Sequence, residues 1–193
     1  MARTASPTPG TTSRTRRAIL DAAYAVLSED SNASMSDVAK AAEVGRSTLH
    51  RYFPDRAALV RALFSDASHA MERTILEAAL EQDTPRAAFR RLIRALFELG
   101  PRVNFLFTES QFSEGVWDDT AWEAAHTPVG ALYERGRREG CFDSEVDVDW
   151  FIRVLWYLIS AGWEAVSDGT LAKHEALDKT TRTLERGLIA HDD

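Results

Sequence analysis

Residues 33–63 constrain the fold more than any other part of the chain, because they have the layout of short helices separated by tight breaks. Ser34 is followed three residues later by Asp37, a spacing typical of a capping box at the start of a helix. We expect the run Glu43–Gly45 to break this helix, with Gly45 supplying the backbone freedom that a sharp turn needs. A second helix should then run from Arg46 to Phe53.

This second helix is predicted to be amphipathic. Leu49 and Phe53 lie four residues apart and would point inward. The outward positions carry side chains that can hydrogen-bond, namely Arg46, Ser47, Thr48, His50 and Arg51. A short helix with an apolar back and a basic, hydroxyl-rich front suits the major groove of DNA. The sequence therefore predicts a helix-turn-helix unit that binds DNA.

The same residues resemble a known family. The run from Val44 to Leu59, VGRSTLHRYFPDRAAL, resembles the DNA-binding signature of the TetR-like transcriptional regulators, and five of its positions fall in register: Val44, Thr48, Leu49, Tyr52 and Phe53. The resemblance covers residues 14–62. At four positions the family usually has glycine, serine, tyrosine and lysine, where this chain has Glu43, Gly45, His50 and Arg56.

The resemblance implies which side chains meet DNA. Arg46, Ser47 and Thr48 fall on positions near base edges, whereas His50, Tyr52 and Arg56 fall on positions that contact phosphates. The full predicted DNA-binding set is Ser34, Arg46, Ser47, Thr48, His50, Arg51, Tyr52 and Arg56. The expected partner is double-stranded DNA with a pseudo-palindromic operator, because the two recognition helices of a homodimer read half-sites about 34–36 Å apart.

The charge of the chain is divided unevenly along its length. The formal net charge is -7, yet residues 1–61 hold nine basic and six acidic side chains, against fourteen and twenty-four in residues 62–193. An acidic remainder would be repelled by phosphates and so would orient the basic end toward DNA. The single cysteine, Cys141, and the lack of a membrane-length apolar run or signal-peptide core lead us to expect a cytoplasmic protein with no membrane contact.

Helical periodicity without strand patterns predicts an all-α chain. We expect a flexible N-terminal tail at residues 1–13, a three-helix DNA-binding domain at 14–61, and a helical effector-binding and dimerisation domain at 62–193. The predicted helices outside the recognition motif cover 14–29, 55–82, 86–99, 102–110, 118–140, 148–167 and 170–189. Thr84 should cap the helix that Pro85 begins, and Pro128 should kink its helix.

The C-terminal part concentrates aromatic side chains between residues 105 and 163. In the TetR-like regulators that this chain resembles, the C-terminal helices enclose an effector pocket. Aromatic walls suit an apolar or flat ligand. We predict a small, mostly apolar effector held among Phe105, Trp117, Trp122, His126 and Trp156, with His126 as its polar contact. The last two helices would form a four-helix interface with their symmetry mates through Leu155, Gly162, Leu177, Leu184 and Leu188.

The favoured interpretation is a ligand-responsive homodimeric repressor without catalytic residues, metal or cofactor. Two other interpretations remain open. Asp119, Glu123 and His126 share one helical stripe, and Glu-x-x-His is a spacing found in metal-binding bundles. A metal-dependent helical enzyme is therefore one alternative, although the sequence holds no second such pair. The other is a DNA-binding scaffold with a filled core, controlled by a protein partner instead of a ligand.

Overall fold

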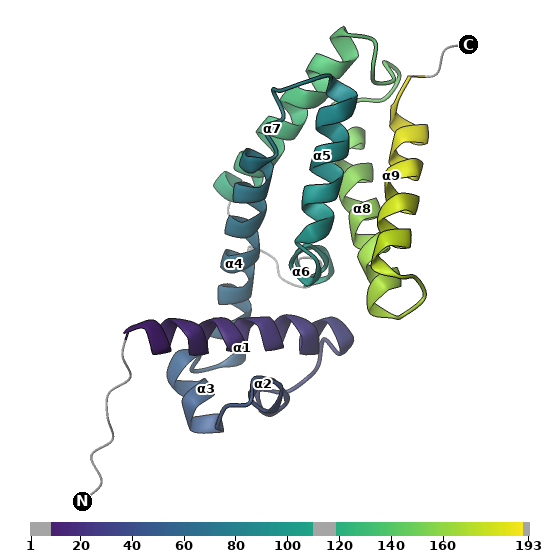
Figure 1. The fold of residues 1–193 in the computed structure, drawn as a ribbon. Helices are drawn as coiled ribbons and strands as arrows, with labels where there is room; N and C mark the ends of the chain where they lie inside the picture. The colour runs from purple at the N-terminus through teal and green to yellow at the C-terminus, as the bar shows by residue number, and fades with distance from the viewer. Residues whose placement is uncertain (1–8, 110–118, 191–193) are drawn as a thin grey trace, which may run out of the picture. The chain divides into compact units, whose positions relative to one another are not determined.

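The computed structural model describes the backbone of residues 9–109 and 119–190 and the side chains of residues 12–106 and 126–190. The regular secondary structure of these residues is helical, and the one β-type pairing among them is an isolated bridge between Phe142 and Ile189 (Figure 1). The prediction of an all-α chain is confirmed. The chain divides into two compact units, Met1–Phe64 and Ser65–Asp193, where the sequence suggested a boundary at residue 61.

The first unit holds α1 (Pro9–Glu29), α2 (Met35–Ala41), α3 (Arg46–Tyr52) and the beginning of α4 (Arg56–Glu77). Helix α1 starts earlier than expected, because a proline is tolerated at the first position of a helix, where its missing N–H would have no partner. Residues 1–8 of the predicted tail lie outside the described part. The core is built from apolar residues of all four helices, among them Ile19, Leu20, Leu27, Val38, Leu49, Leu59 and Leu63.

The turn between α2 and α3 takes a different backbone from the one predicted. The left-handed residue is Glu43, with φ +53°, whereas Gly45 has an extended backbone with φ −68° and ψ 149°. The expectation that Gly45 supplies the conformational freedom is therefore wrong. Gly45 instead caps the start of α3 without a side-chain hydrogen bond. A side chain in the left-handed region is strained, so Glu43 stores energy at a place where glycine would not.

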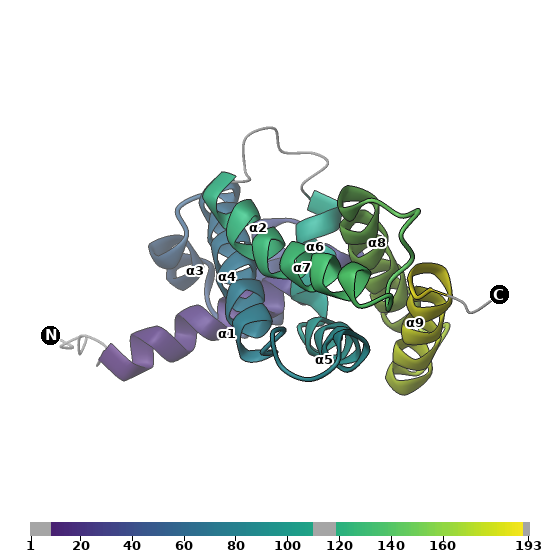
Figure 2. The ribbon, with the colours of Figure 1, turned by 90° about the horizontal axis from the view of Figure 1, so that it is seen from above.

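The second unit continues with α5 (Pro85–Glu98), α6 (Pro101–Glu109), α7 (Asp119–Arg138), α8 (Val148–Ser167) and α9 (Lys173–Leu188). Helices α8 and α9 lie side by side in both ribbon views (Figures 1 and 2). The predicted cap of α5 is confirmed, since Thr84 accepts a hydrogen bond from the Ala87 amide at 3.3 Å and Pro85 begins the helix. Helix α4 ends sooner than predicted, at Glu77.

Aromatic rings fill the interior where α5, α7 and α8 meet. Phe151 lies 5.1 Å from both Phe89 and Tyr133 and 5.0 Å from Phe142, measured between ring centroids. All four rings are buried. Rings at these separations and tilts attract one another beyond their burial. This part of the aromatic-rich segment is therefore packed core.

Candidate DNA-binding surface and effector region

The start of α2 is fixed by the predicted capping box. The Asp37 amide donates to the Ser34 hydroxyl at 3.3 Å, and the Ser34 amide donates to the Asp37 carboxylate at 2.8 Å. The hydrogen bonds that Ser34 donates to the Asp37 carboxylate, from its hydroxyl first and from its amide second, lower the pKa of Asp37. The Ser34 hydroxyl also donates to the same carboxylate at 2.6 Å, so it is engaged within the chain. A contact between Ser34 and DNA stays a prediction.

Helix α3 has the two faces that its sequence predicts. Leu49 and Phe53 are 1% and 3% exposed and belong to the core. The other face carries polar groups in water: Arg46, Ser47, His50 and Arg51 are exposed, and Thr48 and Tyr52 are half-buried. The buried Leu49 and Phe53 anchor the helix to the unit, so the polar face is turned to water. Such a face can donate hydrogen bonds to base edges and to phosphates.

Two side chains of this face have an internal contact that limits what they can offer to DNA. The His50 Nδ1 atom lies 3.1 Å from the Pro54 carbonyl oxygen, which can only accept a hydrogen bond. Nδ1 therefore carries the proton, and the neutral ring presents Nε2 as an acceptor. The Arg51 guanidinium lies over the Tyr52 ring, 5.5 Å from its centroid, which holds the cation on the outside of α3.

Arg56, which the resemblance places at a phosphate, has another role in the structure. It donates to the Ala33 carbonyl at 2.5 Å and also to the Ser31 carbonyl. These residues form the connection between α1 and α2, so the guanidinium ties the first turn of α4 to the entry of the helix-turn-helix. Both of its terminal nitrogens have acceptors within the chain, so Arg56 has a structural role in this unit. A contact between Arg56 and a phosphate stays a prediction.

The predicted effector residues are only partly described. Trp117 lies outside the described residues, and so does the side chain of Trp122. Phe105 on α6 and Trp156 on α8 are each 2% exposed. His126 on α7 is half-buried, and its Nε2 atom accepts a hydrogen bond from the Trp156 indole N–H at 3.3 Å. The structure therefore brings His126 and Trp156 together, although they are 30 positions apart.

A second polar pair lies between α6 and α8. The Ser160 hydroxyl donates to the Asn104 side-chain oxygen at 2.9 Å, and both residues are half-buried. This pair could not be predicted from the sequence, because a single polar residue within an apolar helix gives no sign of which distant residue it meets. Polar atoms in an otherwise apolar interior are the groups that can orient a bound ligand.

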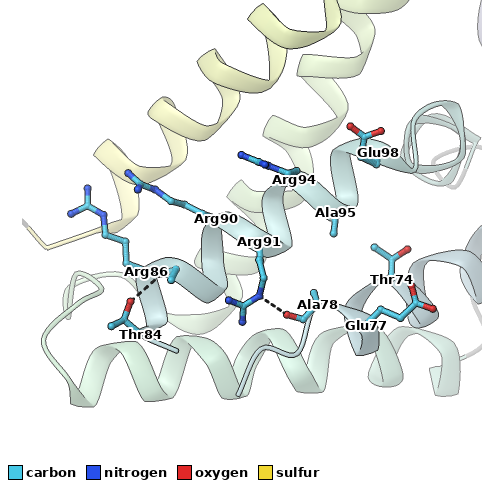
Figure 3. A pocket seen from close by; sticks show the side chains of 11 residues that line it. Thr74, Glu77, Ala78, Thr84, Arg86, Arg90, Arg91, Arg94, Ala95 and Glu98 are labelled. Carbon is cyan, nitrogen blue, oxygen red and sulfur yellow. Dashed lines mark hydrogen bonds between the residues drawn. The ribbon is translucent and has the colours of Figure 1, made fainter. Parts of the chain in front are cut away.

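Two open grooves run along the outside of α5, one on each side of its exposed arginines. The larger, of about 870 Å³, lies against the end of α4 and is drawn in Figure 3. The smaller, of about 430 Å³, lies against α9. None of the five predicted effector residues lines either groove as described. Arg90 and Arg94 line both grooves, and Glu185 of α9 accepts hydrogen bonds from Arg90 at 2.6 and 2.9 Å.

Three of the residues expected at a dimer interface lie inside the protomer. Leu155, Leu184 and Leu188 are at most 1% exposed, because α8 and α9 pack them against their own unit. A Cβ atom added at Gly162 would lie 2.5 Å from the Thr180 hydroxyl oxygen, so this glycine allows a close helix approach within one chain. Leu177 is half-buried and lines the smaller groove. Leu155, Leu184 and Leu188 are therefore out of reach of a partner in this arrangement, and a partner contact at Leu177 or Gly162 stays a prediction.

Other candidate chemistry is limited in the residues that are described. No group of three or more His, Cys, Asp and Glu side chains among them could hold a metal ion, and the side chains of Asp119 and Glu123 lie outside that set. Burial raises the pKa of the Cys141 thiol, which disfavours the reactive thiolate. None of the described helices has the length and apolarity that a membrane crossing requires.

The chain is similar to known proteins, both in its first unit and over most of its length. The family model for bacterial regulatory proteins of the tetR family matches residues 19–63. The chain is 38% identical over 187 residues to the HTH-type transcriptional repressor LfrR of Mycolicibacterium smegmatis, and the match covers 93% of each chain. It is 25% identical over 161 residues to the HTH-type transcriptional regulator NfxB of Pseudomonas aeruginosa, covering 81% of this chain and 83% of that one.

A solved structure extends the likeness to three dimensions. The crystal structure of the TetR-like regulator LfrR from Mycobacterium smegmatis in complex with proflavine is similar with a TM-score of 0.71 and 33% sequence identity. The similarity covers 93% of this chain and 99% of that one. It therefore includes the C-terminal helices as well as the helix-turn-helix unit.

Proposed function

This chain belongs to the TetR family of bacterial regulatory proteins, a family of DNA-binding regulators, and on that basis we propose that it is a homodimeric cytoplasmic repressor released from its operator by a flat, mostly apolar ligand. The observation that carries the proposal is the polar face of α3, which stands exposed on a buried apolar back. The 38% identical relative is itself a transcriptional repressor.

Direct contacts with DNA are proposed for the exposed face of α3. Arg46, Ser47 and Thr48, at its N-terminal end, would meet base edges. Arg51 and Tyr52 would meet phosphates, and His50 would donate to a phosphate through Nε2 when its ring is protonated, because Nδ1 already faces the Pro54 carbonyl. Two such helices in a dimer would read a pseudo-palindrome.

The effector is proposed to lie between α6, α7 and α8. Phe105 and Trp156 offer aromatic walls, and His126, Asn104 and Ser160 offer polar atoms next to them. The similar regulator was crystallised with proflavine, which is a planar aromatic cation. The excess of acidic groups in residues 62–193 favours a cationic ligand over an anionic one. We therefore propose planar aromatic compounds, neutral or cationic, as the ligand class.

The dimer is proposed to form through the outer face of α8. Trp150 and Tyr157 are 54% and 52% exposed, although such large side chains are usually buried. They lie seven residues apart, which places them two turns apart on one face, together with the half-buried Val154 and Leu158. A two-fold axis would pair this stripe with its own copy and remove it from water.

One substitution pair tests this interface. Tyr157→Glu should place a charge in the seam and give monomers by light scattering, with the unfolding transition of the isolated protomer little changed. Leu184→Glu, on α9, should instead place a charge in the protomer core and lower the unfolding temperature. A Tyr157→Glu protein that remains dimeric would move the interface away from this stripe.

The function itself is tested by adding proflavine to the protein bound to the DNA upstream of its own gene. Fluorescence anisotropy of labelled DNA should report a complex that weakens steeply with salt, because phosphate contacts release counterions. Proflavine should then release the DNA. Trp156→Phe, which keeps an aromatic ring and removes the N–H that His126 accepts, should reduce that response and leave the DNA affinity measured without proflavine unchanged. A complex that forms equally on unrelated DNA, or that ignores proflavine and other planar aromatics, would contradict the proposal.

A further inference from the structure

The connection between α4 and α5 is held by two arginines from other parts of the second unit. Arg91 of α5 donates to the carbonyl oxygens of Ala78, Ala79 and Gln82 at 2.9, 2.8 and 3.2 Å. Figure 3 shows its guanidinium turned down from α5 toward the end of α4, with the bond to Ala78 drawn. Arg91 also forms an ion pair of 2.7 Å with the Asp83 carboxylate.

Arg135 of α7 binds the remaining carbonyls of this connection. Its guanidinium donates to the carbonyl oxygens of Leu80, Glu81 and Asp83 at 2.8, 3.1 and 2.9 Å. Each of the six consecutive carbonyls from residue 78 to residue 83 thus accepts a hydrogen bond from one of two guanidinium groups. Hydrogen bonds from a charged donor are stronger than neutral ones, and these six all converge on one short connection.

The backbone of the connection would not adopt this path by itself. Ala79 and Asp83 have φ angles of +46° and +59°, in the left-handed region that residues other than glycine seldom adopt. Strained residues of this kind persist only where their surroundings over-determine them. The two guanidinium groups, together with the Arg91–Asp83 ion pair, supply that constraint.

We propose that Arg91 and Arg135 are positioning residues that fix the end of α4 within the second unit. Helix α4 is continuous from Arg56 to Glu77, so it begins in the first unit and ends at this connection. Arg135 stands on the same helix as His126. The guanidinium that binds three carbonyls of the connection is therefore placed by α7.

The proposal is tested on the full chain with Arg135→Gln, which removes the charge, and Arg135→Lys, which keeps the charge but loses the planar fork. Arg138→Gln is the matched control, because Arg138 lies on the same helix and donates to the Glu134 carbonyl of its own helix. Hydrogen–deuterium exchange should become roughly tenfold faster or more in Arg135→Gln at the amides of Ala78, Ala79 and Gln82, which donate to backbone carbonyls. The change should be smaller in Arg135→Lys and absent in the control.

The second measurement is the affinity for the DNA upstream of the chain's own gene, which rests on the proposed function. Arg135→Gln should weaken it by roughly fivefold or more, as expected for coupling between distant sites. Faster exchange with unchanged DNA affinity would reduce Arg135 to a stabilising residue and overturn the positioning role. Unchanged exchange, or a global loss of helix in both variants, would overturn the clamp. Failure of the wild-type chain to bind this DNA would refute the proposed function, and the exchange result would still decide whether the clamp exists.

Discussion

Replacing Arg56 by alanine should destabilise the DNA-binding unit. The number of phosphates that the protein contacts should stay the same. The guanidinium makes two charge-assisted hydrogen bonds to the carbonyls of Ser31 and Ala33, and Ala33 is only 7% exposed. Losing both bonds leaves at least one shielded carbonyl without its donor, so we expect the free energy of unfolding to fall by about 1–3 kcal/mol. The transition is measured by urea denaturation of the purified protein.

The dependence of DNA affinity on salt separates this structural role from a phosphate contact. If Arg56 neutralised one phosphate in each protomer, its loss would reduce the slope of log K against log salt by ~1.8 for a dimer. A purely structural role of Arg56 predicts no change in that slope for Arg56→Ala. Arg51→Ala should behave in the opposite way, with a reduced slope and little change in stability. A reduced slope with unchanged stability in Arg56→Ala would refute the role given to Arg56.

Three further substitutions follow from the geometry. Glu43→Gly should raise the unfolding midpoint in urea by relieving a left-handed residue. The gain should be about 0.5–1 kcal/mol, because the greater freedom of glycine in the unfolded chain offsets part of the relief, and a lower midpoint would contradict the strain at that turn. Gly162→Ala should cost about 1–3 kcal/mol because its methyl group would meet Thr180, and unchanged thermal melting would show that α8 can yield. Hydrogen bonds from Arg90 lower the pKa of Glu185, so they stabilise the fold near neutral pH, and this stability is lost as pH falls through the folded-state pKa. Glu185→Gln should therefore make the free energy of unfolding fall less steeply in acid. A pH profile identical to that of the wild type would argue against this contribution.

The helix-turn-helix unit could be predicted from sequence because its signals are local. The Ser34–Asp37 box and the alternation of Leu49 and Phe53 with polar residues depend on neighbours within one or two turns, and the structure confirms them. The backbone of the turn was not predictable in the same way. A glycine signals freedom, but here the left-handed position falls on Glu43, two residues earlier.

Long-range partners could not be predicted from the sequence. The sequence shows that Arg56 and Arg135 are basic, but it does not show that backbone carbonyls many positions away already bind them. The apolar stripe that includes Leu184 and Leu188 predicts a buried face, and that face packs against the chain's own helices. Periodicity shows that a face is covered and leaves open whether the same chain or a second copy covers it.

The most direct test of the account compares the affinity of the chain for its operator with its affinity for a scrambled duplex of equal length. The operator would be identified by footprinting the DNA upstream of the gene. Recognition through α3 predicts that the wild-type chain prefers the operator by about 10³-fold or more at physiological salt, and that Arg46→Ala loses about 1–3 kcal/mol of that preference. Equal affinities of the wild-type chain for the two duplexes, or a preference that Arg46→Ala leaves intact, would contradict it.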